Sequence, residues 1–495
     1  MKNISFFVLL LLGNMVAHAQ DPAATITCHY KGVTAGTITV IIPVNNNIYW
    51  ASSKELPVAA DGTCKIALSK NQTGYVEVRG FDKSAMAFVQ PGDKLIFEID
   101  TAANKGAITI SGNNAAGQQL ITDGKLPTSY FALIGKFQKD STVGLITNHV
   151  QQEKDEKLAL FTPLLKQGKI NQSFFDFAKL TLDYTYAAVE GELFAAKFYP
   201  TSYPPEHPAY NPVFPQDYAK AWENVYAKFP VNKEAVSRIP SFESYLDHYM
   251  NAFLSYKKWQ DGDTSKARVG NDYAQIQVKK VRDNFTGSIK EYSEATVLYS
   301  IYVQQRFEKV LPELFADFQK EYPRSAYTQY LTLYNDKVIA YYKATNASFS
   351  ADQHVIENYS SINSFTALTE KFKGKMFFID MWATWCRPCK AEFEFKDGLH
   401  DYLKQKNIPM LYISMDDDKK DEQWKVMIKY YGLKGYHVRT SDSLRNDLIK
   451  IFWNGDGYAI PRYVLVDAQG KIIEKDALRP SDKEALYKQI SSHIE

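Results

Sequence analysis

Two cysteines of this chain lie three positions apart, in the segment WATWCRPCKAEF at residues 382–393. They are Cys386 and Cys389, and the chain of 495 residues has four cysteines in all. A pair with this spacing can bind a metal ion, can be a structural remnant, or can alternate between a dithiol and a disulfide. The residues around the pair have to distinguish these three chemistries.

A metal site is the weakest of the three interpretations. Zinc needs about four ligands, commonly a second cysteine pair or a pair of histidines. The nearest histidines, His400 and His437, do not have such a spacing. A peroxidase would use a lone peroxidatic cysteine rather than a pair. We therefore expect a redox dithiol, with no metal ion and no organic cofactor.

The elements expected around the pair follow the order of a thioredoxin-like α/β domain. An apolar run directly before the pair predicts a strand, and the residues after it predict a helix. Further strands, a second helix and a closing hairpin follow. The expected ranges are 376–381 (strand), 390–406 (helix), 408–414 (strand), 420–431 (helix), 462–467 (strand) and 471–473 (strand). A CxxC pair within a βαβ pattern is typical of a redox site rather than a zinc site.

The position of Cys386 at a strand-to-helix junction suits a nucleophile. A thiolate is the attacking species, and the free N–H groups at a helix start stabilise it. Pro388 fits the first helical turn, where its missing N–H has no role, and Arg387 adds a positive charge. We expect Cys386 to be exposed and to attack a substrate disulfide. Cys389, one turn later, is expected to be shielded and to resolve the mixed disulfide.

Residues 355–495 resemble the thioredoxin-like domain of TlpA/ResA-type envelope thiol–disulfide oxidoreductases. The segment WATWCRPC matches the W-C-x-x-C core of that family. Asp380, six positions before the first cysteine of the pair, matches the buried aspartate of thioredoxin. Ile460–Pro461, just before the run RYVLVDAQG, matches the cis-proline of the family.

The resemblance implies roles for five further residues. Asp380 would accept the proton of the resolving cysteine, and Pro461 would position the substrate. Trp385, Ile460 and Arg387 would contact the substrate, with the backbone of residue 460 offering pairing to an extended segment. The partners implied are protein thiols and disulfides, together with a dithiol protein that donates electrons.

Two departures from the family pattern affect these expectations. Glu394 stands where members usually have a proline, five residues after the second cysteine, which bears on a kink in the helix. Arg-Pro separates the cysteines where thioredoxin has Gly-Pro, so the redox potential of thioredoxin does not transfer. We expect a reductant, because Pro388 and Asp380 match thioredoxin, although the charge of Arg387 favours a more oxidising pair.

The N-terminal part of the chain predicts an all-β sandwich. Short β-rich runs are separated by turn signals, and they cover residues 37–42, 64–68, 75–78 and 94–100. The segment FVQPGDKLIFEID, followed by ISGNNAAGQQL, resembles a β-sandwich domain found ahead of thioredoxin-like domains in bacterial envelope proteins. Cys28 and Cys64 lie on two strands of this β-rich region, which begins near Thr25. We favour a structural disulfide between them, with two separately buried thiols as the alternative.

The middle of the chain has a helical apolar period. One amphipathic face carries six large residues, Phe242, Tyr245, Leu246, Tyr249, Met250 and Phe253. Because an aromatic stripe of this kind is more often core than ligand site, we expect it to be buried. Similar patterns recur at 173–198, 216–229, 292–308 and 326–344. The predicted domains are a β-sandwich at 20–114, an α-helical domain at 115–350 and a thioredoxin-like domain at 351–495.

The first residues, MKNISFFVLLLLGNMVAHAQ, predict a secretory signal peptide at 1–19. A cation, a short apolar run and an Ala-His-Ala pattern favour cleavage near Ala19. We expect the mature chain to lack a transmembrane segment and to be periplasmic or secreted. With 58 basic and 56 acidic residues the net charge is +2, so no nucleic-acid partner is expected.

Together these patterns predict an extracytoplasmic thiol–disulfide oxidoreductase that reduces disulfides in envelope proteins. The alternative is a non-catalytic binding or scaffold protein of the envelope. In that case the first two domains would carry the function, and the thioredoxin-like domain would hold a silent disulfide.

Overall fold

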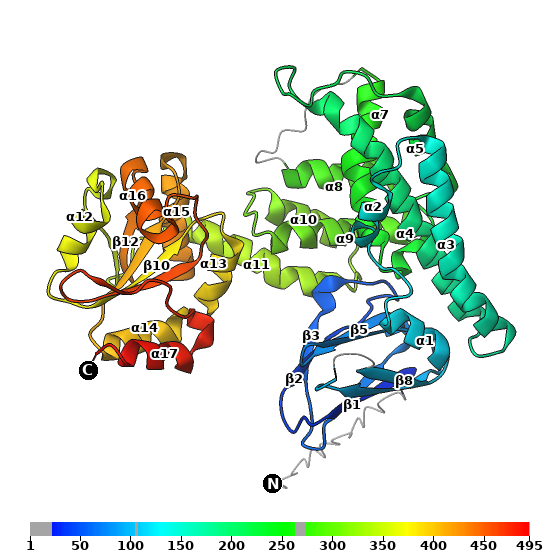
Figure 1. Ribbon diagram of the computed structural model, residues 1–495, viewed down its shortest axis with the longest axis horizontal. Helices are drawn as coiled ribbons and strands as arrows, with labels where there is room; N and C mark the ends of the chain where they lie inside the picture. The colour runs from blue at the N-terminus through cyan, green and yellow to red at the C-terminus, as the bar shows by residue number, and fades with distance from the viewer. Residues whose placement is uncertain (1–21, 104–106, 263–272, 495) are drawn as a thin grey trace, which may run out of the picture. The chain divides into compact units, whose positions relative to one another are not determined.

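The computed structural model describes residues 22–103, 107–262 and 273–494 (Figure 1). The predicted signal peptide lies outside the described residues. The chain clusters into two compact units, one holding 1–268, 277–296 and 324–330 and the other holding 269–276, 297–323 and 331–495, apart from the residues not described. The finer division into domains at 20–114, 115–350 and 351–495 stays a prediction.

Two four-stranded sheets form an N-terminal sandwich, as the sequence predicts. Their strand orders are β4-β1-β7-β8 and β3-β2-β5-β6. Residues alternate along the strands between the solvent and a shared core that includes Ile26, Val40 and Phe97. The strands are β1 (Ala24–Lys31), β2 (Thr37–Ile41), β3 (Lys54–Pro57), β4 (Thr63–Leu68), β5 (Gly74–Gly80), β6 (Lys83–Val89), β7 (Lys94–Asp100) and β8 (Ile108–Gly112).

Helices make up the middle of the chain, which confirms the predicted α-helical region. They are α1 (Ala115–Thr122), α2 (Phe131–Phe137), α3 (Val143–Lys166), α4 (Gln172–Phe198), α5 (Gln216–Lys228), α6 (Phe242–His248), α7 (Leu254–Gln260), α8 (Tyr273–Asn284), α9 (Gly287–Val303), α10 (Leu311–Glu321) and α11 (Thr328–Thr345). The long helices α3 and α4 lie side by side (Figure 1). Five members of the aromatic stripe are buried: Phe242, Tyr245, Leu246, Met250 and Phe253. The stripe is therefore core, although a π-turn at Tyr249–Phe253 interrupts the expected single helix.

Helix α1 covers one edge strand of each sheet with its side chains. Gln118 accepts a hydrogen bond from the N–H of Phe88 on β6 and donates one to its carbonyl, at 3.0 and 2.7 Å. Gln119 accepts from the N–H of Ile110 on β8 and donates to the carbonyl of Ile108, both at 3.0 Å. Open edge strands are templates for unwanted pairing, so these amides protect the sandwich while joining it to the helices.

Cys28 and Cys64 are directly opposite each other on the antiparallel pair β1 and β4. The structure holds both as buried free thiols, not as the disulfide that the sequence favoured. Burial raises the pKa of Cys28 to about 12 and also raises that of Cys64, because a thiolate is poorly solvated there. Opposite residues in such a pair have Cα atoms about 4.5–5.5 Å apart, a separation that a disulfide can bridge. The disulfide stays a prediction.

Oxidation of Cys28 and Cys64 should stabilise the sandwich. In the chain-entropy model, a disulfide that closes the loop between Cys28 and Cys64 contributes roughly 3–4 kcal/mol to the free energy of unfolding. That free energy should be measured with and without reductant in a Cys386→Ser/Cys389→Ser background, which removes the other pair. A further Cys28→Ser change is the matched control and should abolish the response to reductant. Free alkylation of both thiols in mature protein isolated without reductant would contradict the bond.

The C-terminal part is an α/β domain around a six-stranded sheet of order β14-β13-β10-β11-β12-β9. Its strands are β9 (Gln353–Val355), β10 (Phe377–Trp382), β11 (Met410–Ser414), β12 (Gly435–Arg439), β13 (Arg462–Val466) and β14 (Ile472–Glu474). Its helices are α12 (Phe365–Thr369), α13 (Arg387–Glu392), α14 (Lys396–Gln405), α15 (Asp421–Tyr431), α16 (Asp442–Trp453) and α17 (Glu484–Ser491). Helices α14 and α17 cover one face of the sheet, and α12 and α16 cover the other (Figure 1). This confirms the predicted thioredoxin-like order.

The prediction of one continuous helix over 390–406 is wrong. The structure divides it into α13 and α14, separated by a 3₁₀ turn at Phe393–Phe395. Glu394 lies inside this turn, so the break occurs without the proline usual in the family. The ring of Phe393 packs edge-on against buried Trp382, with ring centroids 5.3 Å apart. This contact anchors the turn on the end of β10.

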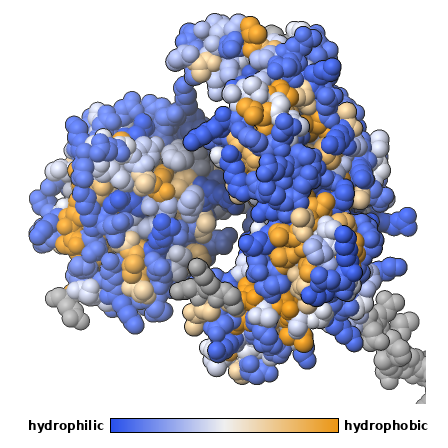
Figure 2. Space-filling view, turned by 45° about the vertical axis from the view of Figure 1, so that its right-hand side comes forward, coloured by the Kyte–Doolittle hydropathy of each residue, from blue (hydrophilic) through white to orange (hydrophobic). Residues whose placement is uncertain are grey.

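The described residues include no helix with the length and apolarity needed to cross a membrane. The face shown in Figure 2 is mainly hydrophilic, and its hydrophobic residues form small separate patches. This distribution agrees with the mixed charge composition of the sequence.

Candidate active site

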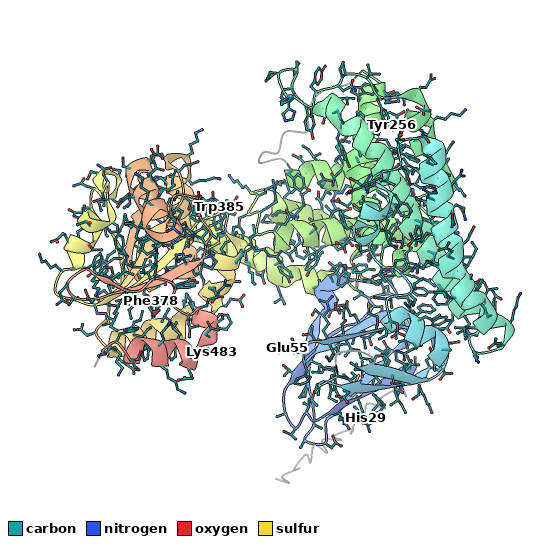
Figure 3. All side chains as sticks on the ribbon, viewed as in Figure 1. His29, Glu55, Tyr256, Phe378, Trp385 and Lys483 are labelled. Carbon is teal, nitrogen blue, oxygen red and sulfur yellow. A yellow bond between two sulfur atoms is a disulfide. The ribbon has the colours of Figure 1, made fainter. Side chains whose placement is uncertain are left out.

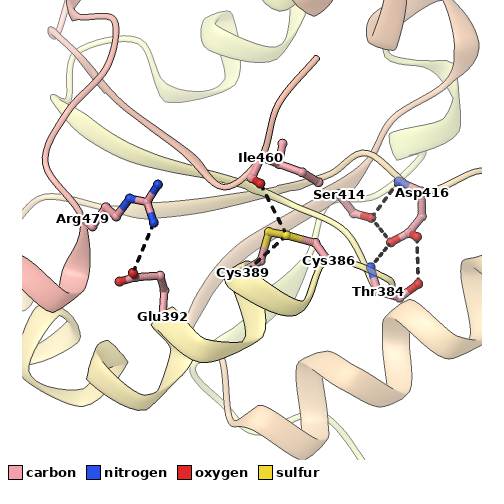
Figure 4. Close-up of a disulfide and its surroundings, with 8 residues drawn as sticks. All are labelled: Thr384, Cys386, Cys389, Glu392, Ser414, Asp416, Ile460 and Arg479. Atoms are coloured by element: carbon pink, nitrogen blue, oxygen red, sulfur yellow. Dashed lines mark hydrogen bonds and ion pairs between the residues drawn. A yellow bond between two sulfur atoms is a disulfide. The ribbon is translucent and has the colours of Figure 1, made fainter. Parts of the chain in front are cut away.

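The two cysteines of the CxxC segment lie where β10 gives way to α13 (Figure 4). Cys386 is the N-cap residue of α13, and it is bonded to Cys389 with the two Cα atoms 5.3 Å apart. The backbone N–H of Cys389 is directed at the Sγ of Cys386, 3.1 Å away. After reduction, this N–H is placed to stabilise negative charge on the Cys386 sulfur.

Cys386 is more enclosed than the sequence predicted, whereas Cys389 is shielded as expected. Cys386 is 3 % exposed and Cys389 is 0 % exposed, so the expectation of an exposed Cys386 is wrong for this oxidised form. The Sγ of Cys386 is covered by its bond to Cys389 on one side, and it lies 3.7 Å from the carbonyl oxygen of Ile460 on the other. Of the two residues, Cys386 remains the more exposed.

The loop that covers Cys386 comes from a distant part of the chain. It ends in a cis peptide bond between Ile460 and Pro461, directly before β13. Strand β13 pairs antiparallel with β10, with Arg462 opposite Met381. This pairing holds the loop beside the dithiol (Figure 4).

The three residues predicted to contact the substrate, Trp385, Ile460 and Arg387, differ in their exposure and in their contacts. Trp385 is 57 % exposed, with its ring centroid 6.3 Å from that of Tyr458 (Figure 3). Ile460 lies against the sulfur of Cys386, as described above, whereas Arg387 is exposed on the first turn of α13. Within the described ranges, no group of three or more His, Cys, Asp or Glu side chains could hold a metal ion.

Asp380 is buried in the middle of the sheet. It is 2 % exposed, and the strand register places it between Tyr412 on β11 and Tyr463 on β13. Among the described residues, none forms a hydrogen bond with its Oδ1. Burial raises the pKa of Asp380 well above its usual range, and the charge of Glu392 raises it further. A buried carboxyl of this kind can hold or accept a proton.

Glu392 was not among the residues that the sequence indicated. The residue is 8 % exposed, and its carboxylate accepts hydrogen bonds from the N–H and hydroxyl of Ser481, at 2.9 and 3.1 Å. Arg479 approaches it to 3.9 Å (Figure 4). One signal could have identified Glu392, because it follows Cys389 by three positions and so lies on the same side of the helix.

A buried polar network fixes the turn that precedes the dithiol. The N–H and the hydroxyl of Thr384 both donate to the carboxylate of Asp416 at 2.8 Å. The hydroxyl of Ser414 donates to the same carboxylate at 2.7 Å, and Arg445 donates to the backbone oxygen of Asp416 at 3.1 Å. The turn before Cys386 is thus tied to the end of β11 (Figure 4). The sequence does not indicate this network, because Thr384 and Asp416 are 32 positions apart in the chain.

Comparison with known proteins agrees with this geometry. Residues 349–490 match the Redoxin family. The C-terminal domain therefore combines a thioredoxin-like fold with a match to the Redoxin family. It holds the disulfide-bonded CxxC pair at a strand-to-helix junction, as described above.

Two curated relatives of the thioredoxin-like domain are named thiol-disulfide oxidoreductase ResA. That of Bacillus thuringiensis subsp. konkukian is 32% identical over 104 residues, which are 21% of this chain and 56% of that protein. That of Bacillus subtilis is 24% identical over 102 residues, which are 21% of this chain and 52% of that protein. The chain therefore spans about half the length of these relatives.

One solved structure similar to the thioredoxin-like domain is the thioredoxin domain of a thiol-disulfide oxidoreductase from Bacteroides vulgatus. It is 23% identical, covering 26% of this chain and 84% of that chain, with a TM-score of 0.21.

Proposed function

We propose that this protein is an extracytoplasmic thiol–disulfide oxidoreductase that reduces disulfides in envelope proteins. The observation that carries the proposal is the arrangement around Cys386. Its sulfur caps α13, receives the N–H of Cys389 and faces the carbonyl of Ile460. The Redoxin match and the names of the ResA relatives support the same chemistry.

The reaction begins with the reduced dithiol. The Cys386 thiolate attacks one sulfur of a substrate disulfide, a new S–S bond forms, and the other substrate sulfur leaves and takes a proton. The thiol of Cys389 then loses its proton to Asp380 and attacks the Cys386 sulfur. This step expels the second substrate sulfur as a thiolate and leaves the Cys386–Cys389 disulfide that the structure contains.

Substrate contact would involve the loop before β13 and the exposed tryptophan of the CxxC segment. Pro461 and the Ile460 carbonyl would align an extended substrate segment, with Trp385 as an apolar contact. A second dithiol protein would reduce the Cys386–Cys389 disulfide after each turnover. Location in the periplasm or outside the cell rests on the signal peptide predicted from the sequence.

The midpoint potential of the Cys386–Cys389 pair tests whether it can turn over. We expect a value above about −300 mV and on the reducing side, near the value of about −270 mV for thioredoxin. The charge of Arg387 favours the thiolate and therefore the reduced form, but water and salt screen this exposed group. Arg387→Gln should consequently shift the potential to a slightly more negative value.

The potential should be measured by alkylation after equilibration in dithiothreitol and glutathione buffers. A Cys28→Ser/Cys64→Ser background ensures that only the Cys386–Cys389 pair is counted. A midpoint well below about −300 mV would contradict the proposal, because it would indicate the silent disulfide of a binding or scaffold protein.

A further inference from the structure

A cavity of about 590 Å³ lies beside α13, within the compact unit that contains the thioredoxin-like domain. Its size is in the usual range for ligand sites. One wall is formed by residues around α13 and α15, and the other by the end of α9 and by α11. Basic side chains, one carboxylate and several aromatic rings line the cavity.

The charge of this lining is strongly unbalanced. Five of its side chains are cations and only one, Glu394, is a carboxylate. Arg306 is paired with Glu308 at 3.0 Å, and Lys396 is paired with Asp397 at 3.0 Å. The other three cations are Lys337, Arg387 and Lys390, and no carboxylate of the described residues forms an ion pair with any of them.

Lys390 is the most unusual of these three cations. It is only 5 % exposed, and among the residues that the structure describes no acceptor receives a hydrogen bond from its Nζ. Burial lowers the pKa of Lys390 to about 8 and Arg387 acts in the same direction, whereas Asp416 opposes them. Burial of most of this side chain weakens the hydration of its ammonium, so an anion that enters the cavity would give it a charged partner that the free protein does not supply.

Aromatic rings form much of the remaining lining, and they are held in place by contacts with one another. Phe307 packs edge-on against Tyr430 with ring centroids 5.3 Å apart, and Phe393 lies 5.0 Å from the ring of Tyr431. The hydroxyl of Tyr431 donates to Gln305 at 3.1 Å. The cavity therefore combines cations that lack a carboxylate partner with aromatic rings that pack against one another, which suits a carboxylate carried on a short apolar stem.

We propose that this cavity binds an acidic side chain of the protein whose disulfide is reduced, so that disulfides flanked by Asp or Glu are preferred. The inference rests on the proposed function. An acidic side chain of the substrate is favoured over a free small anion as the occupant, because the cavity adjoins the dithiol along α13. Arg387 directly follows Cys386, and Lys390 directly follows Cys389. A substrate segment attached to Cys386 therefore needs only a short reach to the cavity.

The test compares two disulfide-linked peptides that differ only in a Glu or a Gln beside the cysteine. The full chain should reduce the Glu peptide with a kcat/KM about tenfold higher, the effect expected for a hydrogen bond to a charged group. The ratio should fall toward one in Lys337→Gln and in Lys390→Met, and it should also decrease as salt is added. Each ratio of the two kcat/KM values is internally controlled, because a substitution that changes the redox potential of the dithiol affects the reduction of both peptides.

Lys343→Gln is the matched control, since Lys343 is an exposed lysine on α11 that does not line the cavity. It should keep the tenfold ratio. Equal rates for the two peptides in the unchanged protein, or a preference that survives both Lys337→Gln and Lys390→Met, would overturn the inference. Inhibition by free glutarate without any peptide preference would assign the cavity to a small anion and overturn it as well. Failure to reduce either peptide would remove the proposed function, and this inference with it.

Discussion

Cys389→Ser should accumulate a covalent complex with substrate, whereas Cys386→Ser should form none. Both variants should lose disulfide reduction down to the uncatalysed rate. The reason is that Cys386 caps α13 and is the less buried of the two residues, whereas Cys389 is completely buried. Without Cys389, the mixed disulfide has no internal thiol to break it.

The measurement is capture of proteins from cell envelopes by each variant, followed by electrophoresis without reductant and again with reductant. A Cys28→Ser/Cys64→Ser background is the control, because it removes the other two thiols as sites of capture. Equal capture by the two variants would contradict the assigned order of attack. It would mean that either sulfur can be the nucleophile.

Asp380→Asn should slow the second step by about 10²-fold near neutral pH while leaving the first attack intact. The asparagine has nearly the same shape but cannot accept the proton of Cys389, and a general base commonly contributes 10² or more. Single-turnover decay of the mixed disulfide isolates this step. In the unchanged protein the decay should become faster as pH rises through the elevated pKa of Asp380, because only the ionised carboxylate accepts a proton. An unchanged decay in the variant would exclude Asp380 from the mechanism.

The same substitution has an expected effect on stability that does not depend on catalysis. The pKa of Asp380 is raised in the folded chain relative to its ordinary value of 3.8. Above about pH 4 the unfolded chain therefore releases this proton before the folded chain does, so ionisation favours unfolding as pH rises. Asp380→Asn lacks this contribution. Its free energy of unfolding should fall less than that of the unchanged protein between pH 4 and neutrality, as denaturant titrations would show.

The sequence by itself determined the classes of the three regions and the position of the dithiol. Alternating β-rich runs, the helical aromatic stripe and the CxxC pair after an apolar run are local patterns, and each is set by the period of one element. The stripe of Phe242 and Tyr245 is buried as its spacing requires. The break at Phe393–Phe395 was not predicted, because it depends on packing against Trp382 rather than on a helix-breaking residue.

Only the tertiary structure decided what surrounds the sulfurs. The contact between Cys386 and Ile460 depends on the pairing of β13 with β10, across more than seventy positions of sequence. The elevated pKa of Asp380 depends on complete burial and on the approach of Glu392 from α13. The cavity around Lys390 likewise needs α11 opposite α13. Burial and electrostatic fields are properties of the space around a side chain, and a one-dimensional pattern does not specify which distant residues fill that space.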